Sequence, residues 1–427
     1  MKAEHQIIRD LSDRLVVAQG PIRILDAIKW DESVQAEFFK YKCERLPAVD
    51  KDYYLKNPLP FEPNEKMSEF HSILRDTKNH LGEYSNITNL IEGRCNDYCK
   101  AVQMLSARGT PMFSEIAMEL YGSPNDAFYP GGPKLSELGT LLAGTLKTLA
   151  LQLKSDADEK RYTATEAMSI LQERLSGYFV NQDKMMVKTS DNIVADAAAG
   201  AEVIKINQNA KFSERDLKYL EVHEGWVHLG TTLNGASQPL CTFLGKGSPS
   251  SSVTQEGLAM ITEIFTFSSN PSRLLKITNR VAALELVRNG ADFIDVFRFF
   301  KEQGVNDIDS YGYSVRTFRG SLPIANAGSF TKDLSYAKGF VLIYNYIRLA
   351  VKEGLVEHIP LFFVGKTLIQ EIQTLKNLME EGIVTMPIHL PPQFKDLAAL
   401  CSWMSMSLFL NKFDLETVAK HYRLILH

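Results

Sequence analysis

The residues with the clearest chemical potential form the stretch His223-Glu224-Gly225-Trp226-Val227-His228. Zinc peptidases of the HExxH type carry two histidines four residues apart on one helix face, and the glutamate after the first histidine acts as general base. Here the two histidines are five residues apart. Five residues of an ideal α-helix turn by about 140°, which points the imidazoles apart, whereas one π-type turn brings them nearly into line. The spacing predicts a zinc-binding pair on a locally irregular helix; the alternative is a surface helix with two solvated histidines.

Glu256 is the candidate for a third metal ligand. It lies in the stretch Gln255-Glu256-Gly257-Leu258-Ala259, which opens an apolar run. Ser252 and Gln255 have the spacing of a capping box, so Glu256 is expected near the first turn of a helix. The segment 230–254 is rich in Gly, Ser, Thr and Pro and is predicted to be a loop that returns this helix to the first. Two histidines, a glutamate and one open position are typical of catalytic zinc; the alternative for Glu256 is a solvated helical glutamate.

Two further features belong to the surroundings of the metal. Glu263 follows Glu256 by two helical turns on the same face, so it is a candidate to accept the second ring hydrogen of a ligating histidine. The alternative is an exposed helical glutamate. The loop 245–252 is expected to border the cleft and to close over a substrate.

The chemistry that these residues predict is hydrolysis of a peptide bond. One zinc ion per chain would make its bound water more acidic and polarise the scissile carbonyl, while Glu224 takes the proton and passes it to the leaving amine. A carboxypeptidase also needs an oxyanion donor and a cation for the terminal carboxylate. Arg319 is the first candidate for the carboxylate and Tyr336 for the oxyanion, with Arg316 and Lys332 as further substrate contacts. The alternatives are surface cations and a packed tyrosine.

The elements before the histidines include a small sheet. β-Branched residues cluster or alternate in the segments 185–189 and 201–207, which we predict to be strands. Ser213 is the expected N-cap of the helix that carries the histidines. Residues 203–207 are the candidate edge strand for β-addition of an extended substrate, with Val203 and Lys205 as contacts; the alternative is an interior strand.

The first half of the chain reads as helical, because apolar residues recur there at spacings of three and four. The predicted helices cover residues 7–18, 32–45, 65–81, 87–107, 135–154 and 165–176. We therefore predict an α+β protein that is predominantly helical, with a helical N-terminal region at 1–165 and the metal-binding domain at 166–427.

With these motifs the sequence resembles the QEGLA-motif proteins, a family related to the microtubule-associated tyrosine carboxypeptidases. The resemblance covers nearly the whole chain and includes the stretches 21–30, 107–110, 197–200, 317–320 and 330–333. It implies a zincin-like (gluzincin) catalytic domain with a small β-sheet, in which His223, His228 and Glu256 bind zinc and Glu224 is the base. Bacterial members are often named as modulators of flavohemoglobin expression. That name describes a phenotype, so a non-hydrolytic regulatory or binding protein that retains the zinc site is the alternative function.

Bulk composition agrees with an enzyme. A chain of 427 residues with 45% hydrophobic residues and a net charge of -4 can bury a large core, and it has no overall attraction to nucleic acid or anionic membranes. The N-terminus carries no apolar signal segment, so we expect a cytoplasmic protein without a membrane partner. The five scattered cysteines are expected to be reduced. The expected partner is a peptide or protein C-terminus, and the oligomeric state stays open.

Overall fold

The computed structural model describes residues 3–179, 185–191, 193, 195–200 and 203–426. Up to residue 178 the described chain forms helices: α1 (Ala3–Gln19), α2 (Ile24–Ala27), α3 (Glu32–Lys40), α4 (Lys51–Leu55), α5 (Pro63–Leu81), α6 (Asn86–Ser106), α7 (Pro111–Tyr121), α8 (Leu135–Gln152), η1 (Asp156–Asp158) and α9 (Ala164–Tyr178). The sheet and the helices that follow it are β1 (Met186–Ser190), β2 (Ala197–Ala199), β3 (Val203–Asn207), α10 (Glu214–Leu220), η2 (Glu221–Leu229), α11 (Gly230–Ala236), η3 (Thr242–Gly245) and α12 (Ser251–Phe265). The last part contains α13 (Pro271–Arg288), α14 (Phe293–Glu302), α15 (Asp307–Phe318), η4 (Thr331–Asp333), α16 (Leu334–Glu353), η5 (Val356–Phe363), η6 (Ile369–Glu371), α17 (Ile372–Glu380), α18 (Pro392–Lys395), α19 (Leu397–Leu410) and α20 (Leu415–Leu426).

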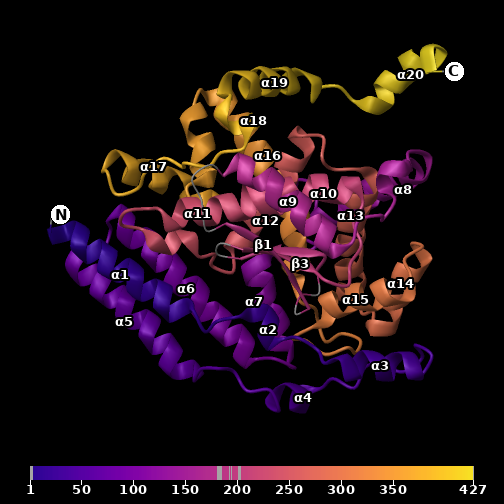
Figure 1. Cartoon of the computed structure of the whole chain (residues 1–427), viewed down its shortest axis with the longest axis horizontal. Helices are drawn as coiled ribbons and strands as arrows, with labels where there is room; N and C mark the ends of the chain where they lie inside the picture. Colours follow the sequence, from indigo (N-terminus) through magenta and orange to yellow (C-terminus); the bar gives the residue numbers. More distant parts are fainter. Residues whose placement is uncertain (1–2, 180–184, 192, 194, 201–202, 427) are drawn as a thin grey trace.

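The predicted class, predominantly helical with a small sheet, is confirmed (Figure 1). The predicted helices in the first half all exist, but the one expected over 32–45 ends at Lys40. Lys42 and Cys43 have φ angles of 53° and 61°, a left-handed conformation that a helix cannot continue through. Among the described residues no helix is long and apolar enough to cross a membrane. All five cysteines are free in the structure.

The sheet has three strands in the order β1-β3-β2, with β1 parallel to β3 and β2 antiparallel to it. The prediction that residues 203–207 form an edge strand is wrong, because β3 is paired on both sides. Val203 and Lys205 therefore cannot offer their backbone to an added substrate strand. Ile204 and Ile206 are buried on one face of β3, which explains why a β-branched strand occupies the centre. The edge next to η2 is instead the alanine strand β2, which its composition did not mark as a strand.

The N-terminal helices share a hydrophobic core with the helices that follow the sheet. Ile8 of α1 and Phe70 of α5 belong to the same buried cluster as Leu258 of α12 and Ile343 of α16. In Figure 1, α1, α5 and α6 lie on one side of the molecule, whereas α19 and α20 lie on the opposite side. Residues from both sides of the predicted boundary at 165–166 thus pack together, and the boundary itself stays a prediction.

Helices α12 and α16 approach closely at two glycines. A Cβ atom on Gly257 would overlap the backbone of Gly339, and one on Gly339 would overlap the carbonyl oxygen of Val253. Backbone atoms cannot move aside as a flexible side chain can, so the contact requires glycine at both positions. This contact fixes the helix that carries Glu256.

We expect Gly257→Ala to lower the free energy of unfolding by about 3 kcal/mol, the upper end of the usual cost of overpacking. Denaturant titration measures the change. Gly144→Ala is the matched control, since Gly144 lies in the exposed part of α8 with nothing within reach of a Cβ atom. The control is expected to raise stability by about 0.5–1 kcal/mol. Equal stability of the wild type and Gly257→Ala would contradict the close packing.

Candidate metal centre and active site

His223 and His228 lie on η2, which is a π-helix over Glu221–Leu229. The local irregularity predicted from their spacing is therefore confirmed. Ser213 caps α10 with a side-chain oxygen that accepts from the N–H of Asp216, also as predicted. The π-turn brings the two imidazoles together, with their Nε2 atoms 3.2 Å apart and their rings 4.7 Å apart between centroids.

Glu256 of α12 completes a triangle with the two histidines. Its Oε2 atom lies 3.3 Å from His223 Nε2 and 3.5 Å from His228 Nε2. A tetrahedral metal with ligand bonds of about 2.0–2.1 Å separates its ligand atoms by about 3.4 Å. The three separations match this value, and the same residues form a group whose ligand atoms all lie within 4.8 Å of one another. Glu256 Oε2 is buried and has no hydrogen-bond partner in the described part of the chain, as expected for an atom that binds a cation.

The start of α12 differs from the sequence prediction. The helix begins at Ser251 rather than after Ser252, and its N-cap Ser250 makes no capping hydrogen bond. Ser250 instead donates from Oγ to Asp97 of α6 at 2.8 Å. Glu256 consequently lies in the second turn of the helix. The predicted loop 230–254 is also shorter, since α11 and η3 occupy much of it.

Glu263 accepts a hydrogen bond from His223 Nδ1 at 2.7 Å, on the side of the ring opposite the triangle. Arg273 of α13, which the sequence did not single out, donates to the same carboxylate oxygen at 3.0 Å. Burial raises the pKa of Glu263, but Arg273 and His223 outweigh burial and lower it to about 2. Glu263 is therefore a buried anion that orients His223 with Nε2 towards Glu256.

We expect Glu263→Gln to weaken zinc binding by about 10- to 100-fold, the usual effect of removing a carboxylate behind a ligating histidine. Competition with a fluorescent zinc chelator measures the affinity. Glu173→Gln, at an exposed position of α9, is the control and should bind zinc like the wild type. An unchanged affinity in Glu263→Gln would show that this carboxylate does not support the metal.

Zinc binding is expected to strengthen with pH. In the metal-free protein burial lowers the pKa of His223, but the neighbouring carboxylates of Glu256 and Glu263 outweigh burial and raise the pKa to about 9. His223 then holds a proton at neutral pH that zinc must displace, so the affinity should rise up to about pH 9 and level off above it. The stability of the metal-free protein should change with pH in the opposite direction. The contribution that protonated His223 makes to the free energy of unfolding is complete below pH 6.5 and is lost as the pH rises through 9. Chelator competition and thermal unfolding across this range test both trends, and a pH-independent zinc affinity would contradict the first.

Glu224 lies beside the triangle and is held by the sheet. Its Oε2 atom accepts a hydrogen bond from the backbone N–H of Ala199 in β2 at 2.8 Å, and its Oε1 atom lies 3.9 Å from His223 Nε2. The strand therefore sets the direction of this carboxylate. A short alanine strand gives no sequence signal for such a role.

The downstream cations predicted to meet substrate have different surroundings. Arg316 donates from Nε and Nη2 to Asp333 at 2.9 and 2.6 Å, so its fork is already occupied. Arg319 is 9% exposed, and its guanidinium lies 5.5 Å from the ring centre of Phe330. Neither arginine lines the cavity at the metal ligands. Lys332 does line it, with Nζ 3.8 Å from Glu256 Oε1.

Tyr336 stacks against His223, with 6.2 Å between ring centroids. Burial raises its pKa to about 12, and the charge of Glu256 acts in the same direction. The phenol thus stays protonated at neutral pH and is able to donate a hydrogen bond. Arg280 of α13 lies 5.2 Å from the Tyr336 ring centre and 3.7 Å from Asp333, a neighbour that sequence reasoning missed.

A cavity of about 280 Å³ adjoins His228 and Glu256. One wall comes from Ile22, Ile24 and Leu25, which lie at the start of the chain in and before α2. Sequence reasoning missed this wall, because no motif links these apolar side chains to residues some two hundred positions later. Ile22 packs against the shared core described above, and Ile22 and Ile24 pack against a second buried cluster that includes Phe113 and Phe330.

The loop 245–252 borders the cavity as expected, since Gly247, Ser248 and Pro249 line it. Two side chains of helix α6 contact this loop, and its closure over a substrate stays a prediction. Arg94 donates to Ser248 Oγ at 2.9 Å, and Tyr98 donates to the carbonyl of Gly247 at 3.2 Å. Arg94 also pairs with Glu371 at 2.6 Å. These contacts connect the loop to α6 where it forms one wall of the cavity.

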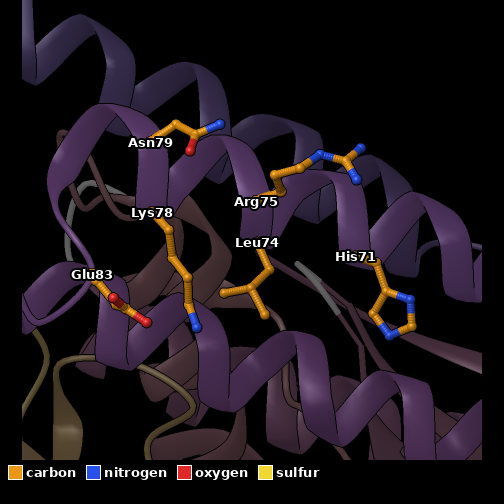
Figure 2. A pocket seen from close by; sticks show the side chains of 6 residues that line it. All are labelled: His71, Leu74, Arg75, Lys78, Asn79 and Glu83. Carbon is orange, nitrogen blue, oxygen red and sulfur yellow. The ribbon is translucent and has the colours of Figure 1, made fainter.

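A larger cavity, about 460 Å³, lies over helix α5 and contains none of the candidate residues (Figure 2). His71, Leu74 and Lys78 project towards it from one helix, and Lys78 is already paired with Glu92 at 3.0 Å. Among the described residues, the group that could hold a metal lies at the smaller cavity and includes none of the residues that line this one.

Comparison with known proteins places the chain in a family. Among solved structures it is similar to the M32 carboxypeptidase from Deinococcus radiodurans R1, with 13% identity, a TM-score of 0.34, and coverage of 92% of this chain and 94% of that one. A TM-score this low assigns no shared fold. No curated protein matches the chain. The model of the family described as microtubule-associated tyrosine carboxypeptidase matches residues 36–412. Because this match spans most of the sequence, the chain belongs to the microtubule-associated tyrosine carboxypeptidase family.

Proposed function

We propose that this protein is a zinc-dependent metallocarboxypeptidase with a zincin-like (gluzincin) catalytic domain, which removes C-terminal residues from a peptide or protein. The observation that carries the proposal is the triangle of His223, His228 and Glu256, with the carboxylate of Glu224 beside it. The family description supports cleavage at a C-terminus. The donor set, two imidazoles and one carboxylate, is the one that leaves zinc an open position for catalysis.

Each residue has a defined part in the reaction. His223, His228 and Glu256 would hold one zinc ion, which when bound supplies a Lewis acid that polarises a carbonyl and makes water more acidic. Glu224 accepts a proton from the attacking water and delivers it to the leaving nitrogen. The N–H of Ala199 holds one Glu224 oxygen in place. Tyr336, protonated at neutral pH, donates to the oxygen on which negative charge develops.

The edge strand β2 is suited to hold the substrate. Gly200 N–H donates to Val203 and Asn207 N–H donates to Asp196, and Ala198 lies opposite Lys205. In an antiparallel pair, residues that hydrogen-bond to the partner strand alternate with residues whose N–H and C=O point away from it. Asp196 and Gly200 bond to β3, so the backbone groups of Ala197 and Ala199 point away from β3. An extended peptide would pair with the outward N–H and C=O of Ala197 and with the C=O of Ala199, because the N–H of Ala199 already donates to Glu224. The proposed substrate-binding strand is therefore β2 and not residues 203–207.

Product identification tests the proposed function. Zinc-loaded protein is incubated with a pool of hexapeptides of varied C-terminal residue, and mass spectrometry follows the loss of single C-terminal residues. Loss of one residue from free C-termini, absent in chelator-treated protein and restored by zinc, is the expected result. Internal cleavage would exclude a carboxypeptidase. No cleavage of any peptide, with zinc bound, would favour the non-hydrolytic binding protein.

A further inference from the structure

Two lysines line the cavity at the metal ligands, and only one of them is available to a ligand. Lys366 Nζ is within hydrogen-bond distance of three oxygens: the carbonyl of His228 at 2.7 Å, Gln255 Oε1 at 2.9 Å and Thr231 Oγ1 at 3.1 Å. These contacts use its donor capacity. Lys332 Nζ makes no hydrogen bond to the residues that the structure describes, and its nearest carboxylate oxygen is Glu256 Oε1 at 3.8 Å.

The amide of Gln255 is held in one orientation. Its Oε1 atom lies between Lys366 Nζ at 2.9 Å and Thr231 Oγ1 at 2.8 Å. If the amide NH2 group of Gln255 faced Lys366, two hydrogen-bond donors would face each other. The amide oxygen must therefore face the lysine. The opposite atom, Nε2, is then buried without a partner among the described residues, although Gln255 lines the cavity. Gln255 is 5% exposed, so water does not readily satisfy these two N–H groups.

The residues that line the cavity next to the metal ligand Glu256 therefore include an ammonium that makes no hydrogen bond, 3.8 Å from Glu256 Oε1, and a buried amide nitrogen that has no partner among the described residues. When a cation binds Glu256, the carboxylate of Glu256 no longer balances the positive charge of Lys332. The cavity then favours an anionic ligand beside Lys332. Arg316 is occupied by Asp333, and Arg319 does not line this cavity. An anion with two oxygens, close to a peptide bond at the metal, is the chemistry of a C-terminal carboxylate.

We propose that Lys332 Nζ and Gln255 Nε2 bind the terminal carboxylate of the substrate, and that Lys366 is the positioning residue that turns the Gln255 amide towards it. This inference rests on the proposed carboxypeptidase function and names its specificity-determining residues. It also assigns to Gln255, beside the metal ligand Glu256, a role separate from metal binding.

Binding to an inactive enzyme tests the assignment without relying on turnover. The zinc-loaded Glu224→Gln variant is titrated calorimetrically with acetyl-Ala-Ala-Tyr as the free acid and as the C-terminal amide. The free acid should bind more tightly. Adding Lys332→Ala or Gln255→Glu should weaken binding of the acid by about 10- to 100-fold, leave the amide unchanged and leave zinc content at one per chain. Gln255→Glu keeps an oxygen for Lys366 and replaces only the donor.

Two further variants separate positioning from general structure. Lys366→Met should abolish the preference for the acid and leave binding of the amide intact, whereas a merely structural role would weaken both. Lys352→Ala, at an exposed lysine of α16, is the control and should keep the preference. The inference is overturned if the acid and amide bind equally to the parent, or if Lys332→Ala and Gln255→Glu retain the preference. Failure of the wild type to cleave any peptide, with the preference intact, would overturn only the proposed function.

Discussion

Replacing Glu224 by glutamine is expected to lower kcat by about 10³-fold while one zinc ion stays bound, because general acid–base catalysis typically contributes 10²- to 10⁴-fold. Glutamine has nearly the same shape, and its oxygen can still accept from the N–H of Ala199. It cannot take a proton from water. Steady-state hydrolysis of the best peptide from the product screen gives kcat, and elemental analysis gives the zinc content.

The outcomes of this substitution are separable. Glu221→Gln is the matched control, since Glu221 lies on the same π-helix but lies 3.5 Å from Arg174 instead of beside the triangle. The control should retain activity. Full activity in Glu224→Gln would remove this residue as the base. Loss of zinc together with activity would assign it a structural role. Identical behaviour of wild type and variant in every assay, with zinc retained, would favour the binding-protein alternative.

Replacing His223 by alanine is expected to remove tight zinc binding. Removing the carboxylate behind a ligating histidine weakens metal binding by up to about 10²-fold, and losing the histidine itself should weaken it more. His223 is one of the three residues of the triangle. Among the described residues it is also the member of the triangle that Glu263 contacts. The variant should also lose the rise in melting temperature that zinc gives the wild type, because a ligand stabilises only the state that binds it.

His71→Ala provides the matched control for this variant. His71 is an exposed histidine of α5 (Figure 2), so the same chemical change there should leave zinc content and stability nearly unchanged. Elemental analysis after dialysis and calorimetry with and without zinc measure both properties. Zinc binding at one equivalent in His223→Ala would remove the proposed metal site.

Some features of the site follow from local sequence alone. Two histidines five residues apart can share a helix face only if the helix takes a π-turn, and η2 is such a turn. The position of Glu263 two turns after Glu256 likewise follows from helix periodicity, and it does contact His223. These predictions were possible because the relevant distances lie within one or two elements.

Other features depend on how distant segments meet. A strand rich in β-branched residues has a similar composition at the centre and at the edge of a sheet. The strand order β1-β3-β2 therefore cannot be predicted from residues 203–207. Arg316, Arg319 and Lys332 look alike as cations in sequence. Only packing shows that Asp333 occupies the first and that the third reaches the cavity.

The metal-ligand candidates, the adjacent base and the need for a π-turn all follow from local spacing, because spacing along a helix fixes which side chains face the same way. The surroundings of these residues depend on how distant segments pack. Packing places α2 in the cavity wall, Ala199 against Glu224, and Lys366 against Gln255. Hydrogen bonds and burial between segments far apart in the chain are set by the packing of the whole core, which no local pattern encodes.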